Sequence, residues 1–212
     1  MTKAVLFDLD GTLFDTSEGI FHTANFTVAK LGLEPCYDER QLRKFVGPPL
    51  KDCFRIVYGY TDDALLSQCV RVYREEYRKT GMHLCHMYDG LYELITQLRD
   101  RGIKTGVCTL KYETLAKLIF DEKGISPLLD TVRGTDESGK VTKAECIRRA
   151  VSDFAIEPSQ ALMVGDTVND LKGAEEAGVP FLGVSWGFGF EKGERLPYGS
   201  LIDRPEEVLN YL

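Results

Sequence analysis

The stretch Ala4-Val5-Leu6-Phe7-Asp8-Leu9-Asp10-Gly11-Thr12-Leu13 lies near the start of a 212-residue chain and decides its fold. Residues 4–9 form a short, mostly apolar run, and the turn residues Asp10, Gly11 and Thr12 follow it. An apolar run of this length that leads into a turn is typical of a buried strand in a parallel sheet. We therefore expect a first strand whose end carries the carboxylates of Asp8 and Asp10.

Beyond residue 82 the chain alternates between short apolar runs and helical patterns. Four segments resemble the first strand, namely 104–109, 129–134, 161–165 and 180–186. Between them, apolar residues recur at helical spacing, and glycines lie where these helices should end: Gly102, Gly124 and Gly178. Alternating strands and helices predict an α/β fold, a doubly wound parallel sheet of the Rossmann-like kind.

The stretch 16–82 departs from this alternation, because it carries several helical patterns and no convincing strand. Apolar stripes at helical spacing lie at 20–31 and 66–77. Gly47-Pro48-Pro49 should end one helix and begin the next, since proline fits the first turn of a helix but not its interior. We expect an α/β core formed by 1–15 and 83–212, with an inserted helical cap at 16–82.

Composition narrows the classes of protein to consider. The net charge of −7 argues against a nucleic-acid partner, and the hydrophobic fraction of 43% is that of a globular chain. The sequence has no apolar run near the ~20 residues that span a bilayer, and its start does not have the pattern of a signal peptide. The six cysteines form no CxxC pair, so they are interpreted as reduced packing residues. We expect a cytoplasmic protein with neither a membrane nor a nucleic-acid partner; the oligomeric state stays open.

Polar residues follow the predicted strands, at the sheet edge where open parallel sheets bind ligands. Those at strand ends are Asp8, Asp10, Thr12, Thr109, Lys111 and Asp166. Asn169 and Asp170 begin the next helix, and Lys143 opens the helix before the fourth strand. Clustered carboxylates repel one another unless a cation holds them together. Oxygen ligands of this kind suit Mg²⁺, so the candidate metal ligands are Asp8, Asp10, Asp166 and Asp170.

The same residues suggest a phosphoryl-transfer reaction. Asp8 is placed to attack phosphorus and form an aspartyl-phosphate, and Asp10 to protonate the leaving oxygen and then activate water. Thr109 and Lys143 could bind the remaining phosphate oxygens. Two alternatives stay open: Lys140 competes for the role of Lys143, and Asp170 could fix the loop or a metal-bound water instead of touching the ion.

Four motifs in order resemble those of the haloacid-dehalogenase-like phosphohydrolase superfamily. They are Asp8-Leu9-Asp10-Gly11-Thr12-Leu13, Thr109 after an apolar strand, Lys143 in Thr-Lys-Ala-Glu, and Gly165-Asp166-Thr167-Val168-Asn169-Asp170. The resemblance covers essentially the whole chain, and its pattern continues into Ala177-Gly178. It implies a Mg²⁺-dependent phosphatase with a small helical cap, in which Asp10 binds the metal through its backbone carbonyl.

Within that superfamily, Phe45–Leu50 and Gly183–Gly189 resemble loops of the phosphoglycolate phosphatase and 5′-nucleotidase-like branch. The branch implies a small-metabolite phosphomonoester as substrate, of the phosphoglycolate or nucleoside 5′-monophosphate class. One departure is Leu110, where relatives often have serine. The alternatives are a phosphosugar mutase of the same superfamily and a catalytically silent binding protein on this fold.

Gly187-Phe188-Gly189 is the last segment that the sequence singles out. It lacks the third glycine and the strand-to-helix setting of a dinucleotide-binding turn. We therefore interpret it as a mobile loop at the rim of the site.

Overall fold

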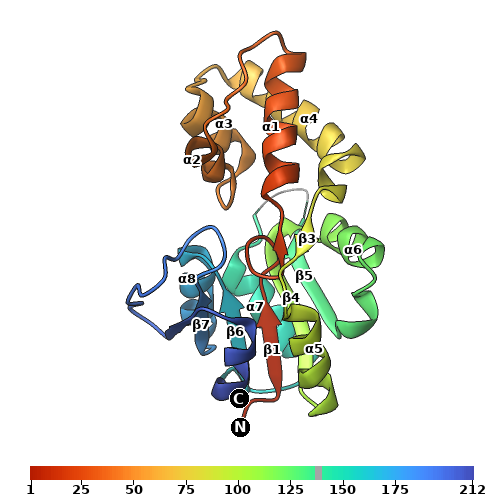
Figure 1. Cartoon of the computed structure of the whole chain (residues 1–212), viewed down its shortest axis with the longest axis vertical. Helices are drawn as coiled ribbons and strands as arrows, with labels where there is room; N and C mark the ends of the chain where they lie inside the picture. The colour runs from red at the N-terminus through yellow and green to blue at the C-terminus, as the bar shows by residue number, and fades with distance from the viewer. Residues whose placement is uncertain (137–139) are drawn as a thin grey trace. The chain divides into compact units, whose positions relative to one another are not determined.

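The computed structural model describes residues 1–136 and 140–212. The chain forms two compact units, one from Met1–Asp15 with Met87–Leu212 and the other from Thr16–His86 (Figure 1). The sequence-based boundary between the insertion and the returning core lies at 82/83, four residues before the one in the structure. Each unit is described below by itself.

The first unit is built on a six-stranded parallel sheet with strand order β5-β4-β1-β6-β7-β8. Its strands are β1 (Ala4–Phe7), β4 (Lys104–Tyr112), β5 (Thr131–Thr135), β6 (Ala161–Gly165), β7 (Phe181–Val184) and β8 (Ser200–Ile202). All four residues of β1 are fully buried, because β1 lies in the middle of the sheet. The doubly wound parallel fold is thus confirmed. The sequence missed β8, whose three residues are too few to show a period.

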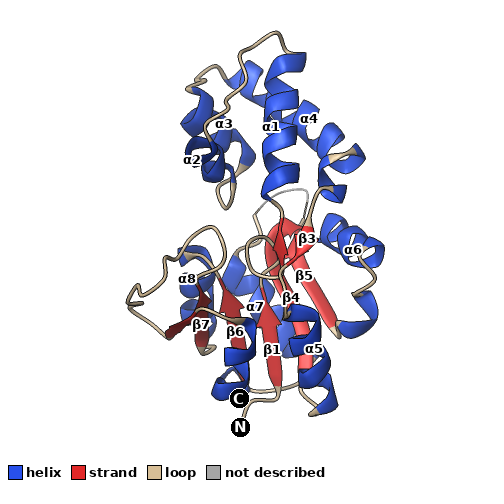
Figure 2. Ribbon diagram, in the orientation of Figure 1, coloured by secondary structure: helices blue, strands red, loops and turns tan. Residues whose placement is uncertain are grey.

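Helices flank the sheet, as Figure 2 shows. They are α5 (Leu91–Asp100), α6 (Glu113–Glu122), α7 (Lys143–Asp153) and α8 (Val168–Ala177), with short 3₁₀ segments η3 (Ser126–Leu128), η4 (Pro158–Gln160) and η5 (Pro205–Tyr211). Apolar residues at helical spacing bury the inner face of α5: Leu91, Leu94, Ile95 and Leu98. Helices α7 and α8 pack against each other as well as against strands. The first residues of these two helices are consequently held close to the sheet.

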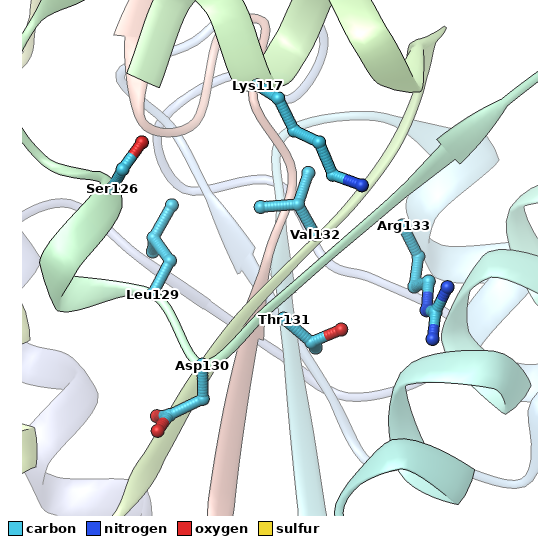
Figure 3. A pocket seen from close by; sticks show the side chains of 7 residues that line it. All are labelled: Lys117, Ser126, Leu129, Asp130, Thr131, Val132 and Arg133. Carbon is cyan, nitrogen blue, oxygen red and sulfur yellow. The ribbon is translucent and has the colours of Figure 1, made fainter. Parts of the chain in front are cut away.

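The sheet edge formed by β5 is covered by charged side chains. Arg133 Nε donates to Asp153 Oδ2 over 2.7 Å, and Thr131 Oγ1 donates to the same oxygen over 2.6 Å. A shallow hollow of about 340 Å³ lies beside this strand, lined by Lys117, Ser126, Leu129, Asp130, Thr131, Val132 and Arg133 (Figure 3). Charges on an edge strand oppose its pairing with another chain.

The second unit is helical, as the sequence predicts for the insertion. It contains α1 (Ser17–Lys30), α2 (Glu39–Leu42), η1 (Arg43–Phe45), α3 (Leu50–Tyr58), α4 (Asp63–Lys79) and η2 (Gly81–His83). Helix α3 begins directly after Pro49, as expected of a proline pair that interrupts and then restarts a helix. Two short strands, β2 (Phe14–Asp15) and β3 (His86–Met87), pair with each other where the chain passes from one unit to the other.

Aromatic rings form much of the interior of the second unit. Phe45 lies edge-on to Phe54 with centroids 5.0 Å apart, and it stacks on Tyr73 at 6.1 Å. Tyr73 stacks in turn on Tyr77 at 5.7 Å. Edge-on and offset arrangements of this kind are the favourable ones for aromatic pairs. The tyrosines of α4 therefore serve as packing residues of the helical unit.

None of the six cysteines, all of which the structure describes, forms a disulfide, and five of them are buried. Among the residues that the structure describes, no helix has both the length and the apolar character needed to cross a membrane.

Helix α1 and segment η2 approach each other backbone to backbone at Gly19 and Gly81. The Gly19 amide donates to the Leu84 carbonyl over 3.1 Å. A Cβ on Gly19 would lie 2.9 Å from the Gly81 carbonyl carbon and even closer to its oxygen. Neither of those backbone atoms can move aside as a flexible side chain could, so the contact requires glycine at position 19.

We predict that Gly19→Ala lowers the thermal unfolding midpoint. Helix propensity alone favours alanine by ~1 kcal/mol, but so short a contact with backbone atoms should cost near the upper end of ~1–3 kcal/mol and outweigh that gain. Thermal melts followed by circular dichroism measure the change. The control is Glu18→Ala on the exposed side of the same turn, which should change stability by less than ~0.5 kcal/mol. A stabilised Gly19→Ala variant would show that the two backbones are not in tight contact.

Candidate active site

The candidate site lies at the carboxyl ends of three neighbouring strands, β4, β1 and β6. Phe7 pairs with Val107 of β4 on one side and with Val164 of β6 on the other. Asp8 follows immediately, and its amide donates to the Val164 carbonyl over 2.9 Å. This register brings the ends of the three strands to one edge of the sheet, where the first, second and fourth predicted strands were expected to place their polar residues.

Three carboxylates gather at this edge. Asp8, Asp166 and Asp170 each offer one oxygen, and these oxygens lie within 4.8 Å of one another. Asp8 is only 7% exposed, and the other two are fully buried. Such a cluster is costly in a folded protein unless positive charge compensates it.

Lys143 supplies part of that positive charge. Its Nζ lies 2.8 Å from Asp8 Oδ1 and 2.6 Å from Asp170 Oδ1, and it donates to the Cys108 carbonyl over 2.9 Å. Lys143 is the first residue of α7, directly after the N-cap Thr142. The structure thus places Lys143 at the site; its competitor Lys140 is exposed.

Asp170 is fixed by the start of α8. The side chain of Thr167 accepts from the Asp170 amide, and Asp170 Oδ2 accepts from the Thr167 amide over 2.9 Å in return, which forms a capping box. The second oxygen is left to face Lys143. Asp170 therefore orients the lysine, whether or not it also contacts an ion.

Asp166 is held by hydrogen bonds to both of its carboxylate oxygens. Thr12 Oγ1 donates to Oδ1 over 3.0 Å, and the Phe188 amide donates to Oδ2 over 2.8 Å. Phe188 belongs to Gly187-Phe188-Gly189, the segment that we interpreted from the sequence as a rim loop. The backbone of this segment therefore contacts the buried acid directly.

The carboxylate of Asp10 is paired apart from the three-acid cluster. Lys111 Nζ lies 2.8 Å from Asp10 Oδ1 and 3.2 Å from Oδ2. Thr109 is buried, and its hydroxyl accepts from the Lys111 amide over 3.1 Å. The pairing of β4 with β5 shifts register between Cys108 and Tyr112, so Thr109 and Lys111 lie in an irregular part of the strand.

Burial dominates the electrostatics of the acids. It raises the pKa of Asp8 to about 7, against the lowering effect of the nearby Lys143 ammonium. It also raises the pKa of Asp166 well above its usual range, and the neighbouring Asp170 and Asp8 carboxylates add to the effect. Burial lowers the pKa of Lys143, but the carboxylates of Asp170 and Asp8 outweigh it and raise the pKa overall. A further cation at the cluster would hold these acids ionised.

The residues of the cluster fit a hard divalent cation. Asp8 Oδ1 and Asp170 Oδ1 are buried and accept no well-aligned hydrogen bond from the described residues, although both lie near Lys143. With all four acids Asp8, Asp10, Asp166 and Asp170 ionised, the two ammonium groups that face them would leave two negative charges, which one divalent cation would balance. All donors are oxygens, the ligand type that Mg²⁺ prefers.

Sequence reasoning missed two parts of this arrangement. It gave Lys111 no partner, and it did not connect Phe188 with Asp166. The sequence signal for the contact between Phe188 and Asp166 was the pair of glycines Gly187 and Gly189. Position 187 requires glycine because a Cβ there would lie 2.5 Å from Asp166 Oδ2. The hollow beside β5 contains none of the predicted site residues.

Comparisons with known proteins agree with this geometry. A family model described as haloacid dehalogenase-like hydrolase matches residues 5–184. The chain is 39% identical over 189 residues to a 5′-nucleotidase from Pseudomonas aeruginosa, covering 88% of this chain and 84% of the relative. It is 32% identical over 200 residues to a phosphoglycolate phosphatase from Rhodospirillum rubrum, covering 90% and 83%.

A solved structure shares the whole architecture. The crystal structure of a predicted phosphatase from Clostridium acetobutylicum superposes with a TM-score of 0.88 at 32% identity, covering 100% of this chain and 98% of that one. The matched residues include β1 with Asp8 and the acids Asp166 and Asp170 that follow β6. The match therefore covers the site as well as the fold. The chain belongs to the haloacid dehalogenase-like hydrolase family.

Proposed function

We propose that the protein is a Mg²⁺-dependent phosphatase that hydrolyses a small phosphomonoester through an aspartyl-phosphate on Asp8. The observation that carries the proposal is the buried cluster of Asp8, Asp166 and Asp170 around Lys143, at the end of the central strand. Membership of a hydrolase family and relatives named as phosphatase and nucleotidase support it.

Asp8 and Asp166 are the proposed side-chain ligands of the ion, with the backbone carbonyl of Asp10 as a further ligand and Asp170 in contact or one water away. When bound, Mg²⁺ would neutralise charge on the phosphoryl group and orient it. Thr109 and Lys143 would hold phosphate oxygens by a hydroxyl and an ammonium hydrogen bond. Lys143 favours the ionised, attacking form of Asp8, because the two groups form a buried ion pair, and a bound cation would favour it further.

In the first step an Asp8 carboxylate oxygen forms a bond to phosphorus, and the bond from phosphorus to the leaving oxygen breaks. Asp10, protonated at this stage, gives its proton to that oxygen and becomes the carboxylate that pairs with Lys111. In the second step Asp10 takes a proton from water, the water oxygen attacks phosphorus, and Asp8 leaves with its electron pair. Lys111 lies against both oxygens of Asp10, which limits the directions in which that side chain can turn.

Substrate choice is assigned to small phosphorylated metabolites of the phosphoglycolate or nucleoside 5′-monophosphate class. The names of two relatives support this choice. We further propose that the helical unit Thr16–His86 serves as a cap that selects the substrate. It is joined to the core by two chain crossings only, at 15/16 and 86/87, and so few connections suit hinge motion.

A substrate panel tests the proposal. We expect purified protein with Mg²⁺ to release phosphate from phosphoglycolate or a nucleoside 5′-monophosphate faster than from hexose phosphates, pyrophosphate or a phosphopeptide. Chelation with EDTA should abolish the reaction, and added Mg²⁺ should restore it. Undiminished turnover by metal-free protein would contradict the metal assignment, and preference for the phosphopeptide would contradict the substrate class.

The nucleophile is tested by Asp8→Asn. The amide keeps the shape of the side chain but removes the attacking charge, so kcat should fall by several orders of magnitude. Mass spectrometry after rapid quench of the unsubstituted protein should find phosphate on Asp8. The fold of the variant is checked by circular dichroism. Phosphate on another residue would contradict the mechanism.

The general acid is tested by Asp10→Asn with two leaving groups. An alkyl phosphate needs a proton on its leaving oxygen, so its hydrolysis should slow by about 100- to 10,000-fold. p-Nitrophenyl phosphate releases a stable phenolate and should slow far less. The comparison uses the single-turnover rate of leaving-group release for both esters with one protein preparation, because the second step, in which Asp10 also acts, is common to them. Equal losses on both would show that Asp10 has a structural role instead of donating the proton.

A further inference from the structure

We propose that the segment Trp186–Phe190 is a positioning element that sets the Mg²⁺ affinity of the site through Asp166. This inference rests on the metal site proposed above. It extends that site to a backbone segment between β7 and β8 that itself offers no ligand to the acid cluster.

The first support is the hydrogen bonding of Asp166. The Phe188 amide donates to its Oδ2 over 2.8 Å, and the Phe190 amide donates to its backbone carbonyl over 2.9 Å. Thr12 Oγ1 donates to Oδ1 over 3.0 Å. Each carboxylate oxygen has two acceptor directions. Among the described residues one hydrogen bond occupies one direction on each oxygen, which leaves the other for an ion. The segment therefore determines which way a buried ligand presents its lone pairs.

The second support is the close approach of the segment to the acid. A Cβ on Gly187 would lie 2.5 Å from Asp166 Oδ2, and it would also collide with the Gly11 carbonyl oxygen. A Cβ on Gly11 would lie 2.6 Å from a ring carbon of Phe188. No side chain fits in either place, so the segment and the turn after β1 enclose Asp166 from two sides.

The third support is a link from the segment back to the first motif. The indole Nε1 of Trp186 donates to the Thr12 carbonyl over 3.1 Å. Thr12 is fully buried and is the residue whose hydroxyl bonds Asp166. The segment thus contributes the Phe188 amide, one of the two hydrogen-bond donors to the Asp166 carboxylate. It also orients Thr12, which carries the other donor. Donors that orient a metal ligand change metal affinity about 10- to 100-fold when they are removed.

The sole tryptophan of the chain is Trp186, so its fluorescence reports on this segment without added dye. Mg²⁺ binding is measured by titrating the metal-free protein and following tryptophan emission, with isothermal calorimetry as an independent readout. We expect Gly187→Ala to weaken Mg²⁺ binding by about 10- to 100-fold. Thr12→Val removes the other donor without adding bulk, and it should weaken binding in the same direction.

The matched control is Gly193→Ala, on the same β7–β8 connection. Gly193 has a positive φ of 81°, and a Cβ there meets nothing within 4 Å. Alanine at this position strains the β7–β8 connection but makes no contact with Asp166. The variant should therefore bind Mg²⁺ as tightly as the unsubstituted protein. Circular dichroism and melting in EDTA establish that each variant is folded. If Gly187→Ala does not fold, Trp186→Phe, which removes the segment's indole donor to the Thr12 carbonyl, is measured by calorimetry and should also weaken Mg²⁺ binding.

The outcomes separate the two proposals. Absence of Mg²⁺ binding by the unsubstituted protein would overturn the metal site and this inference with it. Tight binding by the unsubstituted protein together with equal affinity in folded Gly187→Ala and Thr12→Val would overturn this inference alone. A loss in Gly193→Ala as large as in Gly187→Ala would also overturn it, because strain in the connection would then explain the effect.

Discussion

The ion pairs of Lys143 with Asp8 and Asp170 are the interaction on which the rest of the site depends. Both carboxylates are buried, and their desolvation is tolerable only with a positive charge in contact. Removing one member of such a group leaves an uncompensated buried charge, which costs far more than the pair contributes. The three side chains are therefore coupled, and each must be delivered to the same point by the element that carries it.

Two helices share that task. Lys143 is the first residue of α7, and Asp170 lies in the first turn of α8, so the two helices have to pack in one register. Gly173 of α8 makes the register possible, because a Cβ there would lie 2.7 Å from Cβ of Lys143. The Lys143 side chain thus packs against α8 at Gly173, a position that has no side chain. The packing of α7 against α8 therefore also determines where the Lys143 ammonium lies.

Glycine has a comparable role elsewhere in the molecule, again through close approach of backbone. Gly11 and Gly187 leave room for the Asp166 carboxylate, and Gly19 leaves room for the backbone of η2 in the helical unit. In the first case the space is filled by a carboxylate held by two hydrogen bonds. The contact is therefore useful for chemistry as well as for packing, since it orients a buried acid without placing another side chain beside it.

The sequence by itself determined the alternating α/β pattern, the helical insertion and the acids that end the first and fourth predicted strands. These features are local: a strand of apolar residues, the turn that follows it and a helix cap are all set by neighbours in the chain. Only the tertiary structure decided that Lys111 pairs with Asp10 and that Phe188 donates to Asp166. The first contact joins residues that are 101 positions apart, and the second joins residues that are 22 positions apart. Both depend on strand order, and the first also depends on the shifted register in β4. Residue type and periodicity carry no information on such distances, because strand order arises from how the whole sheet packs.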